Sequence, residues 1–80
     1  MNQQKKQKNL NLFVITDLYT ACGIIEDFVE IPHNVDTEQA HVMAWQYLID
    51  TDVVWTLQGW YGRTAQDLIA RGICTPAREE

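Results

Sequence analysis

The sequence contains no serine, only two cysteines and only six lysines and arginines among its 80 residues. The absence of serine excludes a serine nucleophile. Two cysteines are too few for a disulfide framework, so we interpret Cys22 and Cys74 as reduced thiols of a cytosolic protein. No apolar run approaches the ~20 residues of a membrane-spanning helix. The first eight residues, MNQQKKQK, have no apolar h-region behind them, so we expect no secretory signal and no membrane contact.

Basic residues are scarce outside the N-terminus. The formal net charge is −5, and Lys5, Lys6 and Lys8 all lie in the tail. Residues 9–80 therefore carry three arginines against eleven acidic residues, a net charge of −8. Because nucleic-acid affinity comes mostly from lysines and arginines that displace counterions, this balance disfavours direct nucleic-acid binding. We interpret residues 1–11 as a disordered, solubilising basic tail.

The residue types that build catalytic and metal sites lack the required spacing. Two cysteines and two histidines, His33 and His41, add up to a zinc set, but no C-x₂₋₄-C or H-x₃₋₅-H pair is present. Neither cysteine has a histidine nearby in sequence that would activate it. A domain of this size also has little volume for a pocket. We therefore expect no catalytic residues, no metal and no cofactor, and we do not expect an enzyme.

Hydrophobic periodicity predicts helices over roughly 16–30, 36–50, 52–58 and 64–71. Thr16 is a candidate N-cap of the first helix, and Pro32 ends it near Glu30. Gly23 lies inside that helix, where glycine costs about 1 kcal/mol relative to alanine, so we expect Gly23→Ala to be neutral or stabilising. Asp36 and Gln39 predict a capping box at the start of the second helix. Its apolar positions cover more than half its circumference, which indicates a central helix: Ala40, Met43, Ala44, Trp45, Tyr47, Leu48 and Ile49.

The stretch LQGWYGRTAQDLI, residues 57–69, is predicted to be a corner between two helices. Gly59 would end one helix in a left-handed conformation, with Trp60 folded against Trp55. Gly62 would permit a second bend, and Thr64 with Asp67 would cap the last helix. That helix is expected to end at Gly72, with Ile73 folding back towards Leu68. Asp50 or Asp52 would cap the short helix before the corner.

These elements predict an all-α protein, a small single-domain bundle of three main helices plus a short fourth. We place the helical domain at residues 12–75 and a C-terminal tail at residues 76–80. Residues 10–15 are rich in β-branched residues, and the pattern leaves open whether they are helical or extended.

Residues 44–74, AWQYLIDTDVVWTLQGWYGRTAQDLIARGIC, resemble the end of a family of short proteins encoded by bacteriophages. Upstream, GIIEDFVE and VDTEQA resemble the family's first helix and its acidic connector. The family pattern is close to Q-x-L-I-D-T-G-L-x-W-x-L-Q-G-x-Y-G-R-x-A-x-x-L-I-x-x-G. The chain departs from it at Asp52, where the pattern has glycine, and at Trp60. The matching positions are Gln46, Leu48, Ile49, Asp50, Thr51, Trp55, Leu57, Gln58, Gly59, Tyr61, Gly62, Arg63, Ala65, Leu68, Ile69 and Gly72.

The resemblance implies action in the cytoplasm of an infected bacterium but no established activity. Asp52 implies that the turn after the second helix either avoids a left-handed residue or places an aspartate there. With an enzyme not expected and nucleic-acid binding disfavoured, we expect a binding protein that inhibits or modulates a host protein. A basic groove on that host protein would be complementary to the acidic residues of this chain. The alternative is that the negative charge serves solubility alone. The candidate partner-binding residues form an acidic face and an aromatic corner: Glu26, Asp27, Glu30, Asp36 and Glu38, with Trp45, Trp60, Tyr61 and Arg63.

Two other interpretations stay open. The protein could be a small transcriptional regulator that uses the corner as a helix-turn-helix and TAQDLIAR as its recognition helix. That segment carries Asp67 and a single arginine, Arg71, where several basic or amide residues would be expected. A homodimer is a further alternative, because the second helix is apolar almost all round. The segment LNLFVIT could instead cover the same surface within one chain. Within the corner, we favour a packing role for Trp60 and Tyr61 and a hydrogen-bonding role for Arg63 over an anion site.

Overall fold

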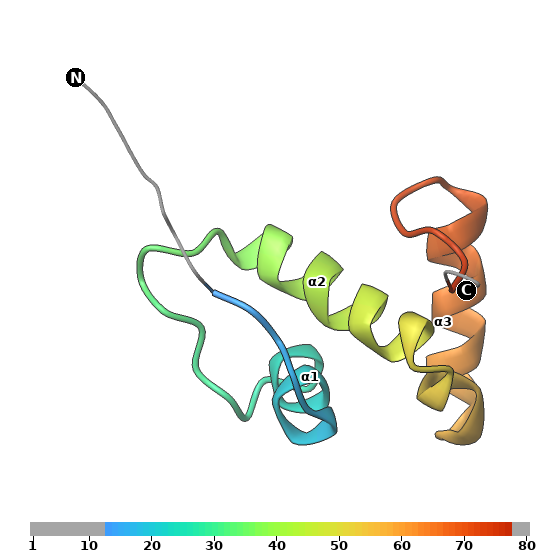
Figure 1. Ribbon diagram of the computed structural model, residues 1–80, viewed down its shortest axis with the longest axis horizontal. Coiled ribbons are helices and arrows are strands. Elements are labelled where there is room, and N and C mark those ends of the chain that lie inside the picture. The colour runs from blue at the N-terminus through green and yellow to red at the C-terminus, as the bar shows by residue number, and fades with distance from the viewer. Residues whose placement is uncertain (1–12, 78–80) are drawn as a thin grey trace.

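The computed structural model describes residues 13–77 (Figure 1). It contains three α-helices and one short 3₁₀ helix: α1 Leu18–Ile25, α2 Thr37–Asp50, η2 Val53–Thr56 and α3 Gly59–Ala70. No strand occurs between residues 13 and 77, so the predicted all-α class is confirmed. Residues 13–16 precede α1 without helical structure. The basic tail predicted for residues 1–11 and the last residues of the C-terminal tail, 78–80, lie outside the described residues.

Helix α2 is the centre of the molecule, as its periodicity predicted. It packs against α1 on one side, and η2 links its C-terminal end to α3, which crosses that end (Figure 1). Five residues of α2 are buried. They form one core with residues from α1, η2, α3 and the segment after α3. The buried core residues are Ala21, Ile24, Ala40, Ala44, Trp45, Leu48, Ile49, Val54, Tyr61, Ala65 and Cys74.

Aspartates cap the first two helices. The Asp36 carboxylate accepts a hydrogen bond from the Gln39 backbone N–H at 2.9 Å, as predicted for the start of α2. The N-cap of α1 is Asp17 and not Thr16. Its carboxylate accepts from both the backbone N–H of Thr20, at 2.7 Å, and the Thr20 hydroxyl, at 3.1 Å. A carboxylate satisfies two donors at once here, so α1 begins one residue later than the threonine would have placed it.

Each of the three α-helices is followed by a residue with left-handed backbone. These residues are Asp27 (φ 71°), Asp52 (φ 65°) and Gly72 (φ 77°). The predicted stop at Gly72 is confirmed: Ile73 N–H donates to the Leu68 carbonyl and Gly72 N–H to the Ile69 carbonyl, both at 3.0 Å.

The prediction that the first helix extends to Glu30 was wrong. Helix α1 ends at Ile25, and left-handed Asp27 turns the chain back across it. The backbone N–H groups of Phe28 and Val29 both donate to the Gly23 carbonyl, at 2.8 and 3.1 Å. Both apolar side chains therefore reach the helix by folding back, although their spacing along the sequence also suits a longer helix.

The predicted corner at residues 59–64 was also wrong. Helix α3 begins at Gly59 and runs unbroken to Ala70, so Gly59 is no stop, Gly62 is no bend and Thr64 is no cap. The turn lies earlier, in η2 and the extended residue Leu57, and Asp52 precedes η2 without a side-chain cap bond. Tyr61 lies one turn before Ala65, and both are buried. The burial of these two side chains stabilises α3, although the helix contains Gly59 and Gly62 and glycine has a low helix propensity.

A side-chain amide fixes the C-terminal segment to α2. Gln46 donates from Nε2 to the Thr75 carbonyl and accepts at Oε1 from the Thr75 N–H, both at 2.9 Å. The same Nε2 donates to Asp50 at 3.0 Å. The neighbouring residue, Cys74, is buried in the core. The segment after α3 is therefore part of the folded unit.

Candidate protein-binding surface

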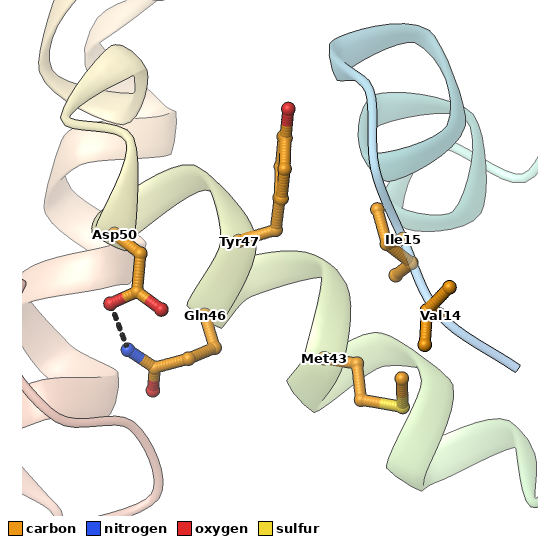
Figure 2. A pocket seen from close by; sticks show the side chains of 6 residues that line it. All are labelled: Val14, Ile15, Met43, Gln46, Tyr47 and Asp50. Carbon is orange, nitrogen blue, oxygen red and sulfur yellow. Dashed lines mark hydrogen bonds between the residues drawn. The ribbon is translucent and has the colours of Figure 1, made fainter. Parts of the chain in front are cut away.

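The described part of the surface has shallow hollows, of which two are considered as binding sites. One, of about 300 Å³, runs between the segment before α1 and one face of α2 (Figure 2). Its walls are Val14, Ile15, Met43 and Tyr47, and its polar end is Gln46 with Asp50, which are already hydrogen-bonded to each other (Figure 2). The other, of about 360 Å³, is lined by the connector residues 30–33. Among residues 13–77, neither hollow is lined by a cysteine, and no three potential metal ligands gather anywhere.

The aromatic candidates do meet, but mostly inside the core. Trp45 packs against Trp60 edge-on, with ring centroids 6.4 Å apart, and Trp60 stacks on Tyr61 at 4.1 Å. Trp45 and Tyr61 are buried, whereas Trp60 is 38% exposed. The predicted contact between Trp60 and Trp55 is replaced by these pairs, and the Trp55 ring faces Gly62 instead. Trp60 is therefore the one aromatic candidate with an accessible edge.

Tyr61 also links α3 to the end of α1. Its hydroxyl donates a hydrogen bond to the carboxylate of Glu26. Burial raises the pKa of Tyr61 above its ordinary value, and the neighbouring Cys22 thiol and the Glu26 carboxylate raise that pKa further. Glu26, predicted as part of an acidic recognition face, is therefore a structural partner of α3.

The two arginines of the described chain both lie along α3. Arg71 forms an ion pair with Asp67 one turn away, at 2.9 Å. The Arg63 guanidinium lies beside Gly59, where a Cβ would be 3.1 Å from its Nη1. Because α3 begins at Gly59, Arg63 lies one turn inside the helix and not at the helix N-terminus that an anion site would have used.

The remaining predicted acids differ in their local roles. Asp36 caps α2 and Asp27 holds the left-handed turn after α1. Glu30 and Glu38 are exposed, and they accept no hydrogen bond from any side chain or turn within residues 13–77. Glu30 and Glu38 are therefore the members of the acidic face that can be changed without removing a cap or a turn.

The larger pattern is a long stretch without compensating charge. From residue 9 to residue 62 the sequence has no lysine and no arginine but eight aspartates and glutamates. The described part of this stretch, residues 13–62, forms α1, the connector between α1 and α2, α2, η2 and the first turn of α3. Nine carboxylates lie between residues 13 and 77, and among these nine only Asp67, on α3, forms an ion pair. Residues 17–52, which hold these eight carboxylates and are called the acidic side below, therefore have no cationic partner within the described chain.

An exposed aromatic pair, missed by the sequence analysis, lies on this acidic side. Tyr19 is 66% exposed and Phe28 is 54% exposed, and their ring centroids are 5.3 Å apart. The sequence analysis had placed Phe28 inside a helix that ran to about residue 30. Two residues in the sequence could have indicated this arrangement. Gly23 lies one turn after Tyr19, and Asp27 is a residue type that tolerates left-handed backbone.

Comparison with known proteins identifies one family. Residues 33–79 match the family described as Domain of unknown function (DUF7417). No curated protein and no solved structure matches the chain. The match includes α2, η2 and α3, and therefore Asp36, Glu38, Trp45, Trp60, Tyr61 and Arg63. Tyr19, Glu26, Asp27, Phe28 and Glu30 lie outside it. Among residues 13–77, no helix has the length and apolar character needed to cross a membrane. Because the match covers more than half of the chain, the protein belongs to the DUF7417 family.

Proposed function

We propose that this protein is a bacteriophage accessory factor that binds a cationic host protein in the bacterial cytoplasm and inhibits or modulates it stoichiometrically, without turnover. The observation that carries the proposal is the set of carboxylates at the two ends of α1, in the connector and on α2 that have no cationic partner between residues 13 and 77. A cationic surface is complementary to such a face, and complementary charge speeds encounter and rejects partners of the same sign.

The placement of these acids adds a second argument. The C-terminal end of a helix carries partial negative charge, so carboxylates there are unfavourable by about 0.3–1 kcal/mol each. Glu26 and Asp27 follow α1 directly, and Asp50 and Asp52 lie at the end of α2. Neither helix has a basic residue in its last turn. A cationic partner would relieve this repulsion, so binding gains energy that the free protein lacks.

The alternative of a helix-turn-helix regulator has less support. It needed a corner before TAQDLIAR, but that segment is the second half of a continuous α3. Its single arginine, Arg71, is paired with Asp67. Nucleic-acid binding requires a basic face, and no residue between 9 and 62 is a lysine or arginine.

The test is capture of a partner from infected-host lysate at two salt concentrations. Glu30→Gln with Glu38→Gln removes two charges from the acidic side and leaves the caps intact. Gln66→Lys with Ala70→Lys changes the net charge equally on exposed positions of α3 and serves as the control. We expect a one-to-one, nuclease-resistant complex that weakens as salt rises. The double glutamine variant should weaken capture and reduce its salt dependence, and the control should do neither.

Two results would count against the proposal. Nuclease-sensitive capture would favour the regulator. Capture that is unchanged in strength and salt dependence in Glu30→Gln/Glu38→Gln would show that the acidic side is not the interface. The homodimer stays a prediction, which analytical ultracentrifugation can test. Repulsion between like charges disfavours an interface formed by two acidic sides.

A further inference from the structure

The Tyr19–Phe28 pair is an unusual feature of so small a surface. Two aromatic side chains, each more than half exposed, lie with ring centroids 5.3 Å apart and ring planes inclined by 55°. Leu18, beside Tyr19 in sequence, is also 41% exposed. Exposed apolar side chains that cluster in this way mark interaction sites more often than single ones do.

The fold holds the pair in place before any partner arrives. Tyr19 and Gly23 lie one turn apart on α1, and the Phe28 ring covers the glycine: a Cβ at Gly23 would be 3.0 Å from Phe28 Cε1. The Phe28 N–H donates to the Gly23 carbonyl at 2.8 Å. Backbone and side chain of Phe28 are therefore both fixed against α1, which lowers the entropy that binding would cost.

The residues next to the pair along the chain are acidic, and their charge indicates what binds there. Asp17 lies two residues before Tyr19, Asp27 directly precedes Phe28, and Glu30 follows two residues later. Aromatic faces and carboxylates both attract cations. An arginine satisfies both at once, because its planar guanidinium stacks on a ring and pairs with a carboxylate through two N–H groups. A lysine ammonium is compact and strongly hydrated, and it makes only the charge contact well.

We propose that the Tyr19–Phe28 pair is the anchor site for an arginine side chain of a cationic protein segment, with its guanidinium stacked on one ring of the pair, beside the other, and paired with a neighbouring carboxylate. This inference rests on the proposed function, because it names the anchor of the same acidic side. A second copy of this chain is a poor occupant, because it would bring the same carboxylates to the contact.

Defined peptides provide the test. Three twelve-residue peptides on one alanine–glutamine background carry four arginines, four lysines or four citrullines, the uncharged isostere of arginine. Affinity for the full-length protein is measured at two salt concentrations, and aromatic NMR shifts locate the contact. We expect the arginine peptide to bind more tightly than the lysine peptide, the citrulline peptide not to bind, and the largest ring shifts at Tyr19 and Phe28.

Variants separate stacking from charge. Phe28→Leu keeps an apolar side chain over Gly23 but removes the aromatic face. Tyr19→Leu also removes one aromatic face of the pair, at a position that is 66% exposed, so it tests the pair even if Phe28→Leu unfolds. Each should weaken arginine-peptide binding roughly two- to fivefold, the range of an exposed cation–π contact. Trp55→Leu removes an aromatic ring that is 44% exposed on η2 and does not belong to the pair, so it is the control and should leave binding unchanged.

The outcomes distinguish this inference from the proposed function. If arginine and lysine peptides bind equally and Tyr19→Leu has no effect, while Glu30→Gln/Glu38→Gln still weakens host-protein capture, the arginine anchor is wrong and the proposed function stands. If neither peptide binds and no cationic host protein is captured, both are wrong. Shifts of Tyr19 and Phe28 that follow protein concentration without peptide would identify a second copy as the occupant and overturn the inference.

Discussion

The hydroxyl of Tyr61, in the first turn of α3, donates a hydrogen bond to the Glu26 carboxylate immediately after α1. This contact joins residues 35 positions apart and connects the first helix of the fold to the last. It lies beside the Trp45 ring, whose centroid is 5.5 Å from that of Tyr61. One candidate of the predicted acidic face and one of the predicted aromatic corner are therefore partners of each other.

Removing the hydroxyl of Tyr61 should destabilise the fold without unfolding it. Tyr61→Phe loses a hydrogen bond to a charged, partly hydrated acceptor, which corresponds to about 1–2 kcal/mol of unfolding free energy. Urea denaturation followed by circular dichroism measures the change. Tyr19→Phe, on an exposed ring, is the control and should change the unfolding free energy by less than about 0.5 kcal/mol. Equal effects in the two variants would mean that the link to Glu26 carries no stability.

Stability should decline in alkaline solution. The pKa values of Tyr61 and Cys74 are both raised by burial in the folded state, and the Asp50 charge adds to the shift at Cys74. The unfolded chain therefore releases these protons first, so the stability they contribute is complete below about pH 8.5 and falls as pH rises past ~8.5 for the thiol and ~10 for the phenol. Urea titrations between pH 7 and pH 11 should show this fall, and it should be shallower above pH 10 in Tyr61→Phe. A flat profile would contradict the assignment.

Two helical glycines should respond to alanine in opposite directions. At Gly23 a Cβ would come within 2.8 Å of the Val29 Cβ and closer still to its Cγ2, whereas at Gly62 the nearest atom, Trp55 Cε3, lies at 3.7 Å. Gly23→Ala should therefore lose about 1–3 kcal/mol by overpacking, and this prediction replaces the neutral or stabilising change expected from the sequence. Gly62→Ala should gain about 0.5–1 kcal/mol from helix propensity. Thermal unfolding of the pair measures both, and a stabilised Gly23→Ala would show that Val29 does not pack there.

Substitutions at two positions with left-handed backbone, Gly72 and Asp52, distinguish the cost of backbone strain from the loss of side-chain contacts. A Cβ at Gly72 would meet nothing within 4 Å, so Gly72→Ala should cost about 1 kcal/mol through its backbone conformation alone. Asp52 already has φ 65° without a side-chain cap bond. Asp52→Gly should therefore stay within about 0.5 kcal/mol of zero, or stabilise. Chemical denaturation of both variants measures the two changes, and an equal loss in both would show that the Asp52 side chain has a role of its own.

The Gln46 amide should control access to Cys74. Gln46→Ala removes both hydrogen bonds to Thr75, which frees the segment that covers the buried thiol. In a Cys22→Ala background, so that Cys74 alone reacts, a thiol reagent should label Gln46→Ala faster than the background protein at the same pH. Gln66→Ala on the exposed side of α3 is the control. Equal labelling rates in all three proteins would mean that Gln46 does not hold the segment closed.

Much of the fold and some of the candidate surface could be predicted from the chain alone. The helical class, the central place of α2, the Asp36 cap and the stop at Gly72 all follow from local signals: a period of 3.6, a carboxylate at an N-cap, a glycine at a helix end. The charge imbalance is also a property of composition. These features depend on residues within one or two turns of each other, so local physics determines them.

Tertiary contacts decided the rest. Gly59 and Gly62 read locally as breakers, but burial of Tyr61 and Ala65 draws them into α3. Phe28 and Val29 read locally as helical, but Asp27 turns the chain back and packs them on Gly23. Whether Glu26 faces solvent or an α3 hydroxyl depends on a residue 35 positions away. Local propensities differ by about 1 kcal/mol or less, whereas burying one large side chain contributes roughly 1.5–3 kcal/mol. Where the two compete, packing across the fold prevails, and it alone brings Tyr19 and Phe28 together on the surface.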